Sequence, residues 1–268
     1  MIVSEIAVTL FLFIVGIRFF TSPHDRKRSE ILLVAAFFAF PAIRFFQILA
    51  GNLIRCLAAW RPVRYDLYAW SFDAHLGYSS FFLGRWVASS RFLSVLVAQV
   101  YDMPFLAMLA VFAVYVYLRE SQKALPLWTF FFNAIVALPI YIAFPVAGPK
   151  FIFPNFPQGP GPVAVHRIFA AATVPNGVPS DHTSTALLCA ALLWPWKWGR
   201  VFGVAFVLLT ILATLANGEH YIFDLLTAVP YSWLIWKLAH WTFRPASSGQ
   251  TTRVAAIEGP GATMQVEV

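Results

Sequence analysis

Two short motifs at the ends of apolar segments contain the residue types that acid–base and nucleophilic chemistry needs. Pro179-Ser180-Asp181-His182-Thr183-Ser184 precedes one apolar run, and His220-Tyr221-Ile222-Phe223-Asp224 follows another. Ionisable residues cost roughly 2.5–3.5 kcal/mol each inside a membrane-spanning helix, so they mark candidate functional sites there. Two histidines and a carboxylate at the ends of such helices therefore form a candidate active site.

The second motif has the spacing of an oriented histidine. His220 and Asp224 are four residues apart, so on a helix their side chains share a face and can touch. A carboxylate bonded to one ring nitrogen sets the tautomer and leaves the other nitrogen basic. With His182 as a second imidazole, one ring can attack phosphorus while the other protonates the leaving alcohol. The set is suited to covalent phosphoryl transfer.

The first motif predicts the start of a helix, with Ser180 as the N-cap. Free backbone N–H groups at such a start suit an anion such as phosphate. Ser180 is better explained as a cap than as a catalytic group. Zinc binding by His182, His220 and Asp224 is chemically feasible. No metal-spaced His or Cys pair favours it, so we expect neither a metal nor a cofactor.

The composition indicates a polytopic membrane protein. Hydrophobic residues make up 60% of the 268 positions and charged residues only 12%. A soluble domain would have about 45–50% apolar and about 25% charged residues. The net charge of +7 does not indicate nucleic-acid binding. The basic residues lie mainly in short loops between apolar runs, which is the pattern that sets membrane orientation.

Apolar runs of membrane length predict an all-α polytopic bundle with six core transmembrane spans, or seven. A helix needs about 20 apolar residues to cross the hydrocarbon core. The candidate spans are 3–20, 31–50, 93–118, 125–145, 183–199 and 201–217, with a further apolar stretch at 221–241. We expect residues 1–244 to form a single transmembrane domain and residues 245–268 to be a disordered tail.

Loop charge predicts the orientation of these spans. The basic or mixed segments alternate onto one side, which the positive-inside rule makes cytoplasmic, namely 24–28, 119–123, 197–200 and the tail from Arg244. Both motifs then lie on the outer side. The connection 51–92 lies there too, and its aromatic residues predict a partly helical, interfacial segment. The Pro- and Gly-rich segment 145–179 predicts a loop at the same face.

The motifs resemble the second and third motifs of the type 2 phosphatidic acid phosphatase superfamily. Pro179-Ser180-Asp181-His182 is similar to the family's Pro-Ser-x-His, and His220, Tyr221 and Asp224 match its His-Tyr-x-x-Asp. The resemblance implies that His220 is the nucleophile, forming a phosphohistidine, and that Asp224 orients it. It implies that His182 is the general acid. It also implies a metal-independent enzyme that acts on lipid phosphoesters.

The resemblance covers about residues 145–235 and departs from the family pattern where phosphate-binding cations are usual. After Lys150 and six further residues the chain reads Pro157-Gln158, whereas the phosphatase branch has Arg-Pro. Ala213 and Thr214 stand where Ser-Arg usually opens the third motif. Asp181 also replaces a common Gly.

Other residues would have to bind the phosphate. Lys150 and Arg167, in the outer loop, are the candidate cations, although both could instead reach lipid headgroups. Ser180 and Tyr221 complete the expected substrate-binding set. Headgroup transferases with a bare His-His-Asp set tolerate the loss of the usual cations, so the resemblance favours that branch.

Three functions remain open from the sequence. The first is a lipid headgroup phosphotransferase similar to inositol phosphorylceramide synthases, in which a lipid alcohol captures the phosphohistidine. The second is a lipid phosphate phosphatase, in which water does so. The third is a non-catalytic transporter or lipid-binding protein that keeps the histidines for pH sensing. We expect membrane lipids as substrates, and a bacterial inner membrane with the active site on the periplasmic face.

Overall fold

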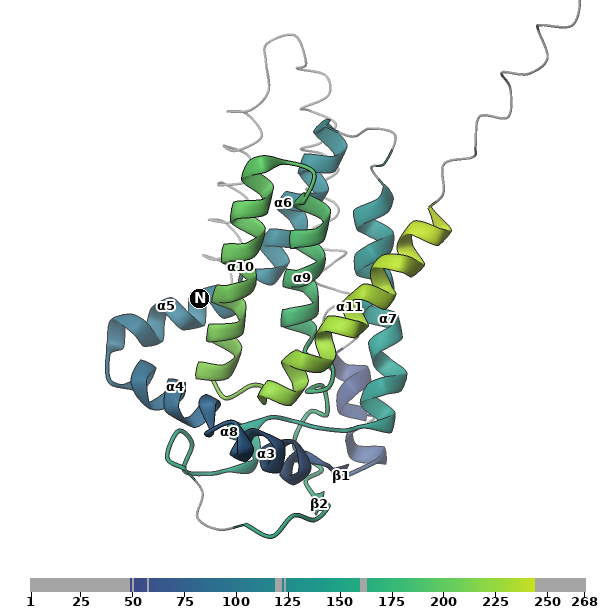
Figure 1. Ribbon diagram of the computed structural model, residues 1–268. Helices are drawn as coiled ribbons and strands as arrows, with labels where there is room; N and C mark the ends of the chain where they lie inside the picture. Colours follow the sequence, from purple (N-terminus) through teal and green to yellow (C-terminus); the bar gives the residue numbers. More distant parts are fainter. Residues whose placement is uncertain are drawn as a thin grey trace, which may run out of the picture.

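The computed structural model describes residues 49, 51–56, 58–118, 122, 124–159 and 163–243. This part of the chain is mostly helical, as predicted (Figure 1). It also contains a short antiparallel pair that the all-α prediction missed, in which β1 (Val63–Arg64) pairs with β2 (Ile168–Phe169). The predicted tail 245–268 and the predicted spans 3–20 and 31–50, apart from Leu49, lie outside the described residues.

A bundle of helices is arranged around α9 (Asp181–Leu193). α9 packs against α6 (Pro104–Leu118), α7 (Ala124–Ala143), α10 (Lys197–Ala216) and α11 (Ile222–Thr242). α6, α7, α9 and α10 run along the bundle, and α11 crosses it obliquely (Figure 1). Because α9 and α11 both start at the same end of the bundle, their first turns lie close together.

Two described helices, α7 and α10, are long and apolar enough to cross a membrane. A third span is reached if α5 (Arg91–Tyr101) and α6 count as one, although they are bent by 47° at their junction. α11 is long enough but falls short in apolarity. The described residues thus support a membrane protein, but they do not reach the predicted six core spans.

Two predicted spans differ from the observed helices because proline residues start or end the helices there. The expected span 93–118 is interrupted after Tyr101, and α6 begins at Pro104, a residue that suits the first position of a helix. The expected span 183–199 ends at Leu193, because Pro195 cannot continue the helix. Lys197 and Arg200, predicted to lie in a loop, therefore belong to the first turn of α10.

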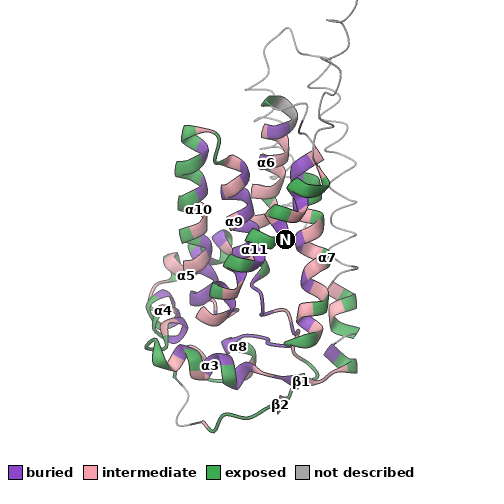
Figure 2. Ribbon diagram, turned by 45° about the vertical axis from the view of Figure 1, so that its right-hand side comes forward, coloured by how far each residue is buried: buried purple, intermediate pink, exposed green. Residues whose placement is uncertain are grey.

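A layer of short elements crosses the end of the bundle at which α9 and α11 start. It consists of α3 (Asp66–His75), α4 (Ser79–Ala88), α8 (Pro149–Ile152) and the strand pair (Figures 1 and 2). The prediction of a partly helical segment at 51–92 is confirmed by α3 and α4. Leu67, Trp70 and Phe81 of this layer form a buried cluster with Tyr221. Burial of each such side chain contributes about 1.5–3 kcal/mol, so the layer is firmly attached to the start of α11.

Arg64 is a structural residue of this layer. Its guanidinium is completely buried and donates to the carbonyl oxygens of Arg61 and Val63 and to both the hydroxyl and the carbonyl oxygen of Thr173, at 2.6–3.0 Å. A buried cation is tolerated only when it is paired or hydrogen-bonded in this way. The two bonds to Thr173 attach the outer loop to β1, and burial lowers the pKa of Arg64.

Candidate active site

His220 and Asp224 form a pair at the start of α11, although not in the way that the helical spacing predicted. Asp224 lies in the first turn of α11, whereas His220 precedes the N-cap residue Tyr221. The Asp224 Oδ2 atom is 3.3 Å from His220 Nδ1 and accepts a hydrogen bond of 2.9 Å from the backbone N–H of Tyr221. The carboxylate therefore closes the helix start and holds the ring at the same time. His220 Nε2 is left as the nitrogen available for chemistry.

The Pro-Ser motif forms the predicted helix start. The Ser180 hydroxyl accepts a hydrogen bond of 3.3 Å from the backbone N–H of Thr183, so the N-cap prediction is confirmed. Ser180 is completely buried, and its own N–H donates to the Asp224 carbonyl oxygen at 3.2 Å. This backbone bond links the first turns of α9 and α11. It holds His182, the second residue of α9, beside His220.

The two histidine rings are near neighbours. Their centroids are 6.1 Å apart, and the ring planes are inclined by 58°. A nucleophile attacks from about 3 Å, and a proton donor reaches a leaving oxygen from about 3 Å. Two rings at this separation are close enough for both to reach one phosphoryl group. Tyr101, the last residue of α5, stacks on His182 with centroids 4.0 Å apart.

His182 lies in surroundings that disfavour its charged form. Burial, together with the nearby His220, lowers the pKa of His182 to about 3. The ring is therefore neutral at physiological pH when the site is empty. An anionic phosphate beside it would favour the imidazolium and raise that pKa. His182 can thus become an acid when an anion binds.

Lys150 lies next to the histidine turn. Its ammonium forms an ion pair with Glu219, the residue before His220, and its backbone N–H donates to the Gly218 carbonyl oxygen at 2.9 Å. The structure therefore places this predicted substrate-binding cation close to the turn that carries His220. Glu219 had no place in the sequence interpretation. Its carboxylate would compete with a bound phosphate for the same ammonium.

The other two predicted substrate-binding residues lie elsewhere. Arg167 is exposed, and its guanidinium lies over the Tyr65 ring at 5.8 Å; no described contact joins it to either motif histidine. Tyr221 is completely buried in the cluster beneath α3. Its backbone N–H, rather than its ring, contributes to the site by binding Asp224.

Asp181 brings a negative charge to the start of α9. Its Oδ1 atom accepts a hydrogen bond of 2.8 Å from the Asn133 side-chain amide, which also donates to Thr185 at 3.2 Å. Asn133 is buried in the middle of α7, and it therefore reaches the site from a neighbouring long helix. Asp181, Asp224 and Glu219 surround the histidines with carboxylates. An anionic ligand at this site would be opposed by that charge.

No group of three or more His, Cys, Asp or Glu side chains in the described part of the chain has an arrangement that could hold a metal ion.

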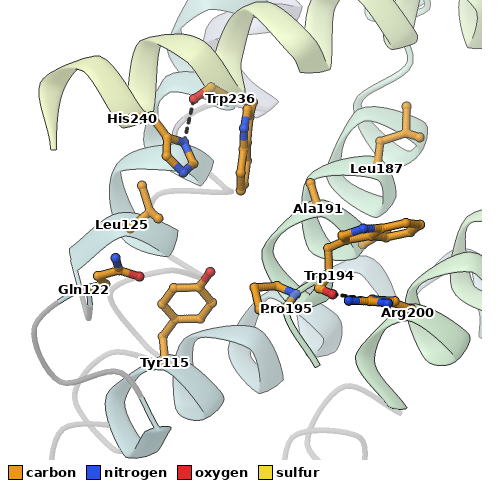
Figure 3. A pocket seen from close by; sticks show the side chains of 11 residues that line it. Tyr115, Gln122, Leu125, Leu187, Ala191, Trp194, Pro195, Arg200, Trp236 and His240 are labelled. Carbon is orange, nitrogen blue, oxygen red and sulfur yellow. Dashed lines mark hydrogen bonds between the residues drawn. The ribbon is translucent and has the colours of Figure 1, made fainter. Parts of the chain in front are cut away.

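A separate cavity of about 650 Å³ lies at the other end of the bundle, where α9 ends and α10 begins (Figure 3). Trp194, Arg200, Trp236 and His240 are among its lining residues, and neither motif histidine lines it. The cavity is thus distinct from the candidate active site.

Several residues of the site were given no role in it by the sequence interpretation, because they come from other elements. Asp73 and Ser80, in the layer across the bundle end, bind the backbone on either side of the His220 turn. Asn133 comes from α7 and Tyr101 from the end of α5. One signal was available, since Asp66, Trp70 and Asp73 recur at helical spacing and place two acids on a buried face. The other residues had none, because their partners are 48 to 140 positions away.

A comparison with models of known protein families finds a match for this chain. The family model described as the PAP2 superfamily matches residues 66–238, which is more than half of the chain and includes both motifs and α3. No curated protein matches the chain. No solved structure matches it. The chain therefore belongs to the PAP2 superfamily.

Proposed function

We propose that the protein transfers a phospho-headgroup between membrane lipids through a phosphohistidine at His220. Membership of the PAP2 superfamily fits phosphatase or phosphotransferase activity on lipids. The observation that carries the proposal is the histidine pair: His220 held by Asp224 at 3.3 Å, with the His182 ring 6.1 Å away. A nucleophile, its orienting carboxylate and a second imidazole are the parts that covalent phosphoryl transfer requires.

The first step uses the two rings in succession. His220 Nε2 attacks the phosphorus atom of the donor lipid, and the bond from phosphorus to the diacylglycerol oxygen breaks. Protonated His182 gives its proton to that oxygen, so diacylglycerol leaves as the neutral alcohol. Asp224 stabilises the positive charge that develops on His220, because its carboxylate accepts a hydrogen bond from the Nδ1–H group. The phospho-headgroup then remains on His220.

The second step returns the enzyme to its starting state. His182, now neutral, takes the proton of the acceptor alcohol, and the alcohol oxygen attacks phosphorus. The bond from phosphorus to His220 breaks, and the transferred headgroup leaves on the new lipid. With a lipid monophosphate such as phosphatidate as the donor and water in place of the alcohol, the same steps would make the protein a lipid phosphate phosphatase that releases free phosphate. We favour the alcohol because Asp181 and Glu219 oppose a doubly charged lipid monophosphate more than a phosphodiester with a single charge.

The test uses purified protein in detergent with phosphate-labelled phosphatidylinositol or phosphatidate, with and without ceramide or diacylglycerol. We expect a labelled lipid product that appears only when the acceptor alcohol is present. His220→Ala should abolish turnover, whereas His166→Ala should not, because His166 is exposed and bonds only to its neighbour Ala164 within the described structure. Free phosphate as the sole product would make the protein a phosphatase.

A non-catalytic role makes the opposite prediction. A transporter or lipid-binding protein would leave every labelled lipid unchanged, with or without His220. Acid-labile label on the protein, absent from His220→Ala and present in His166→Ala, would support the covalent intermediate. Turnover without such label, or with label that survives acid, would contradict it.

A further inference from the structure

The helices α3 and α4 bind the backbone that carries His220. The Asp73 carboxylate accepts hydrogen bonds from the backbone N–H groups of Ile222 at 2.9 Å and Phe223 at 3.3 Å. The Ser80 hydroxyl donates to the His220 carbonyl oxygen at 3.2 Å. Asp73 is 2% exposed and Ser80 1% exposed, so water does not compete with these bonds. The position of His220 therefore depends on where α3 and α4 lie.

The opposite face of the same two helices is apolar and exposed. Large side chains recur at intervals of four residues, which places them on one face of each helix. They are Tyr68, Phe72 and Leu76 along α3 and its C-cap, and Tyr78, Phe82 and Trp86 along α4 and its N-cap. Phe82 is 61% exposed and Trp86 48% exposed. We call these six residues the aromatic face.

The aromatic face is in direct contact with the start of α11. The Phe72 ring packs edge-on against the Phe223 ring, with centroids 5.5 Å apart. Phe223 is also one of the two residues whose N–H groups bind Asp73. A displacement of α3 thus reaches α11 both through an aromatic contact and through a buried carboxylate.

Charge and chain continuity indicate what covers this face. Arg85 and Arg91 are exposed beside it, and α5, which starts at Arg91, leads into the bent α5–α6 pair that is apolar enough to enter a membrane. Aromatic side chains flanked by arginine are characteristic of the headgroup region of a bilayer, where the rings enter the interface and the cations meet phosphates. A lipid surface fits both features.

We propose that α3 and α4 form an interfacial platform, which seats its aromatic face in the headgroup layer of the bilayer and holds His220 at that depth through Asp73 and Ser80. Because the bilayer fixes the depth of α3 and α4, it also fixes the depth of the nucleophile His220. Its role in turnover rests on the proposed function, but its depth in the membrane does not. Asp73 is a positioning residue, since it touches backbone rather than substrate.

The first test measures depth and needs no activity. Single spin labels are placed by Phe82→Cys or Trp86→Cys, with Cys56→Ser to remove the exposed native thiol. The full chain is reconstituted into phosphatidylcholine vesicles that contain phosphatidylglycerol. We expect both labels to be relaxed by oxygen, which concentrates in the bilayer, more than by a water-soluble nickel complex. Val165→Cys, on the exposed outer loop, should show the reverse.

Labels at 82 and 86 that respond like the one at 165 would overturn the platform, whatever the enzyme assay shows. Conversely, the labels could be relaxed mainly by oxygen in a protein that shows no turnover. That result would contradict the proposed function and still support the platform. The two proposals are therefore separable.

The second test measures coupling to the site. The double variant Phe82→Ser with Trp86→Ser should raise KM for a bilayer-embedded substrate by about tenfold or more, the worth of one large buried side chain. It should leave turnover of a short-chain, water-soluble phosphatidylinositol, assayed with a short-chain acceptor alcohol, unchanged. Trp198→Ser serves as the matched control, because Trp198 is 70% exposed and lies in the first turn of α10, at the end of the bundle away from the histidines. Equal losses on both substrates would contradict the proposal.

Asp73→Ala should lower kcat on both substrates by up to about a hundredfold, because a small misplacement of a reacting group has that effect. Asp73→Asn keeps an oxygen that can accept the two N–H groups and should restore part of the loss. A variant that changes only KM, or no recovery in Asp73→Asn when both proteins are equally stable, would show that Asp73 does not position the nucleophile.

Discussion

Single residues decide the chemistry of this site through their neighbours. His220 is 3% exposed, and its Nδ1 faces a carboxylate that also closes the start of α11. One carboxylate thereby orients the nucleophile and caps the helix. His182 differs, because no carboxylate in the described part of the chain forms a hydrogen bond with its ring, and Tyr101 stacks on one of its faces. The two histidines are therefore unequal in the empty site, which suits one to attack and the other to proton transfer.

The low pKa of His182 predicts a specific pH behaviour. A general acid is lost as pH rises through its pKa, and in the free protein that pKa is about 3. Bound phosphate raises it, so the enzyme–substrate complex should keep the acid form to higher pH. Because kcat reports the complex and kcat/KM the free enzyme, we expect the alkaline limb of kcat to lie at higher pH. If the alkaline limbs of kcat and kcat/KM lie at the same pH, the role of His182 as the general acid is contradicted.

His182→Gln provides the control for that profile. The substitution removes the titrating ring, so the limb assigned to His182 should vanish from both parameters. Activity should fall by about 10²–10⁴-fold, the usual contribution of a general acid. A limb that persists in this variant belongs to another group.

Asp181 predicts an effect of charge on affinity. Asp181→Asn removes one negative charge beside the histidine pair and keeps a side chain that can bond to Asn133. KM for an anionic lipid phosphoester should fall several-fold, because like charges repel. The variant should not lose stability, because burial raises the pKa of Asp181 and the folded protein therefore disfavours its charged form. The measurements are a substrate titration and a thermal unfolding curve, and a higher KM would contradict the assignment.

At the scale of elements, close backbone contact holds the outer loop against the His220 turn. Asp66 accepts hydrogen bonds from the backbone N–H groups of Ala147 and Gly148 at 2.8–3.1 Å. Burial raises the pKa of Asp66 to about 7, while these two N–H groups act in the opposite direction. Gly148 has φ of 124°, and a Cβ there would lie 2.1 Å from the Glu219 carbonyl oxygen. Only glycine allows this approach.

Gly148→Ala should therefore disturb both stability and turnover. Strain at a positive φ costs about 1–3 kcal/mol, and relief of the clash would move the backbone next to His220. We expect a lower melting temperature and a lower kcat. Gly159→Ala is the matched control, because no heavy atom lies within 4 Å of a Cβ added there, and it should change stability by less than about 0.5 kcal/mol. Equal effects of the two variants would show that the approach at Gly148 is unimportant.

At the scale of the whole molecule, the bundle has two unlike ends. One end holds both motifs beneath α3, α4 and α8, and the other holds the junction of α9 and α10 with its basic residues (Figure 1). The positive-inside rule predicts that the second end is cytoplasmic. The cavity of Figure 3 then opens on the side opposite to the histidines.

Labelling of intact bacterial cells checks this orientation. In a Cys56→Ser background, Val165→Cys should react with a membrane-impermeant maleimide, and Trp198→Cys should react only after lysis. Both positions are exposed, at 44% and 70%, so access rather than burial decides the result. Cys189 is buried and should stay unlabelled. The reverse pattern would place the histidines in the cytoplasm, and labelling of both residues before lysis would contradict a membrane-spanning bundle.

The sequence by itself determined what is local in this protein. A serine after a proline and before an apolar run specifies the start of α9, and a carboxylate four residues after a histidine specifies the pair with His220. Apolar composition specified helices of membrane length. These features depend on neighbours within one or two turns, so residue type and spacing are sufficient to predict them.

Only the tertiary structure decided which distant residues complete the site. Ser80 and Asp73 reach the His220 turn from 140 to 150 positions away, and Asn133 reaches Asp181 across 48. It also decided that Arg64 and Tyr221 are buried in the supporting layer, whereas Lys150 lies beside the site. The reason is physical. Such partners are selected by the packing of whole helices, and buried polar groups must find hydrogen bonds wherever that packing places them.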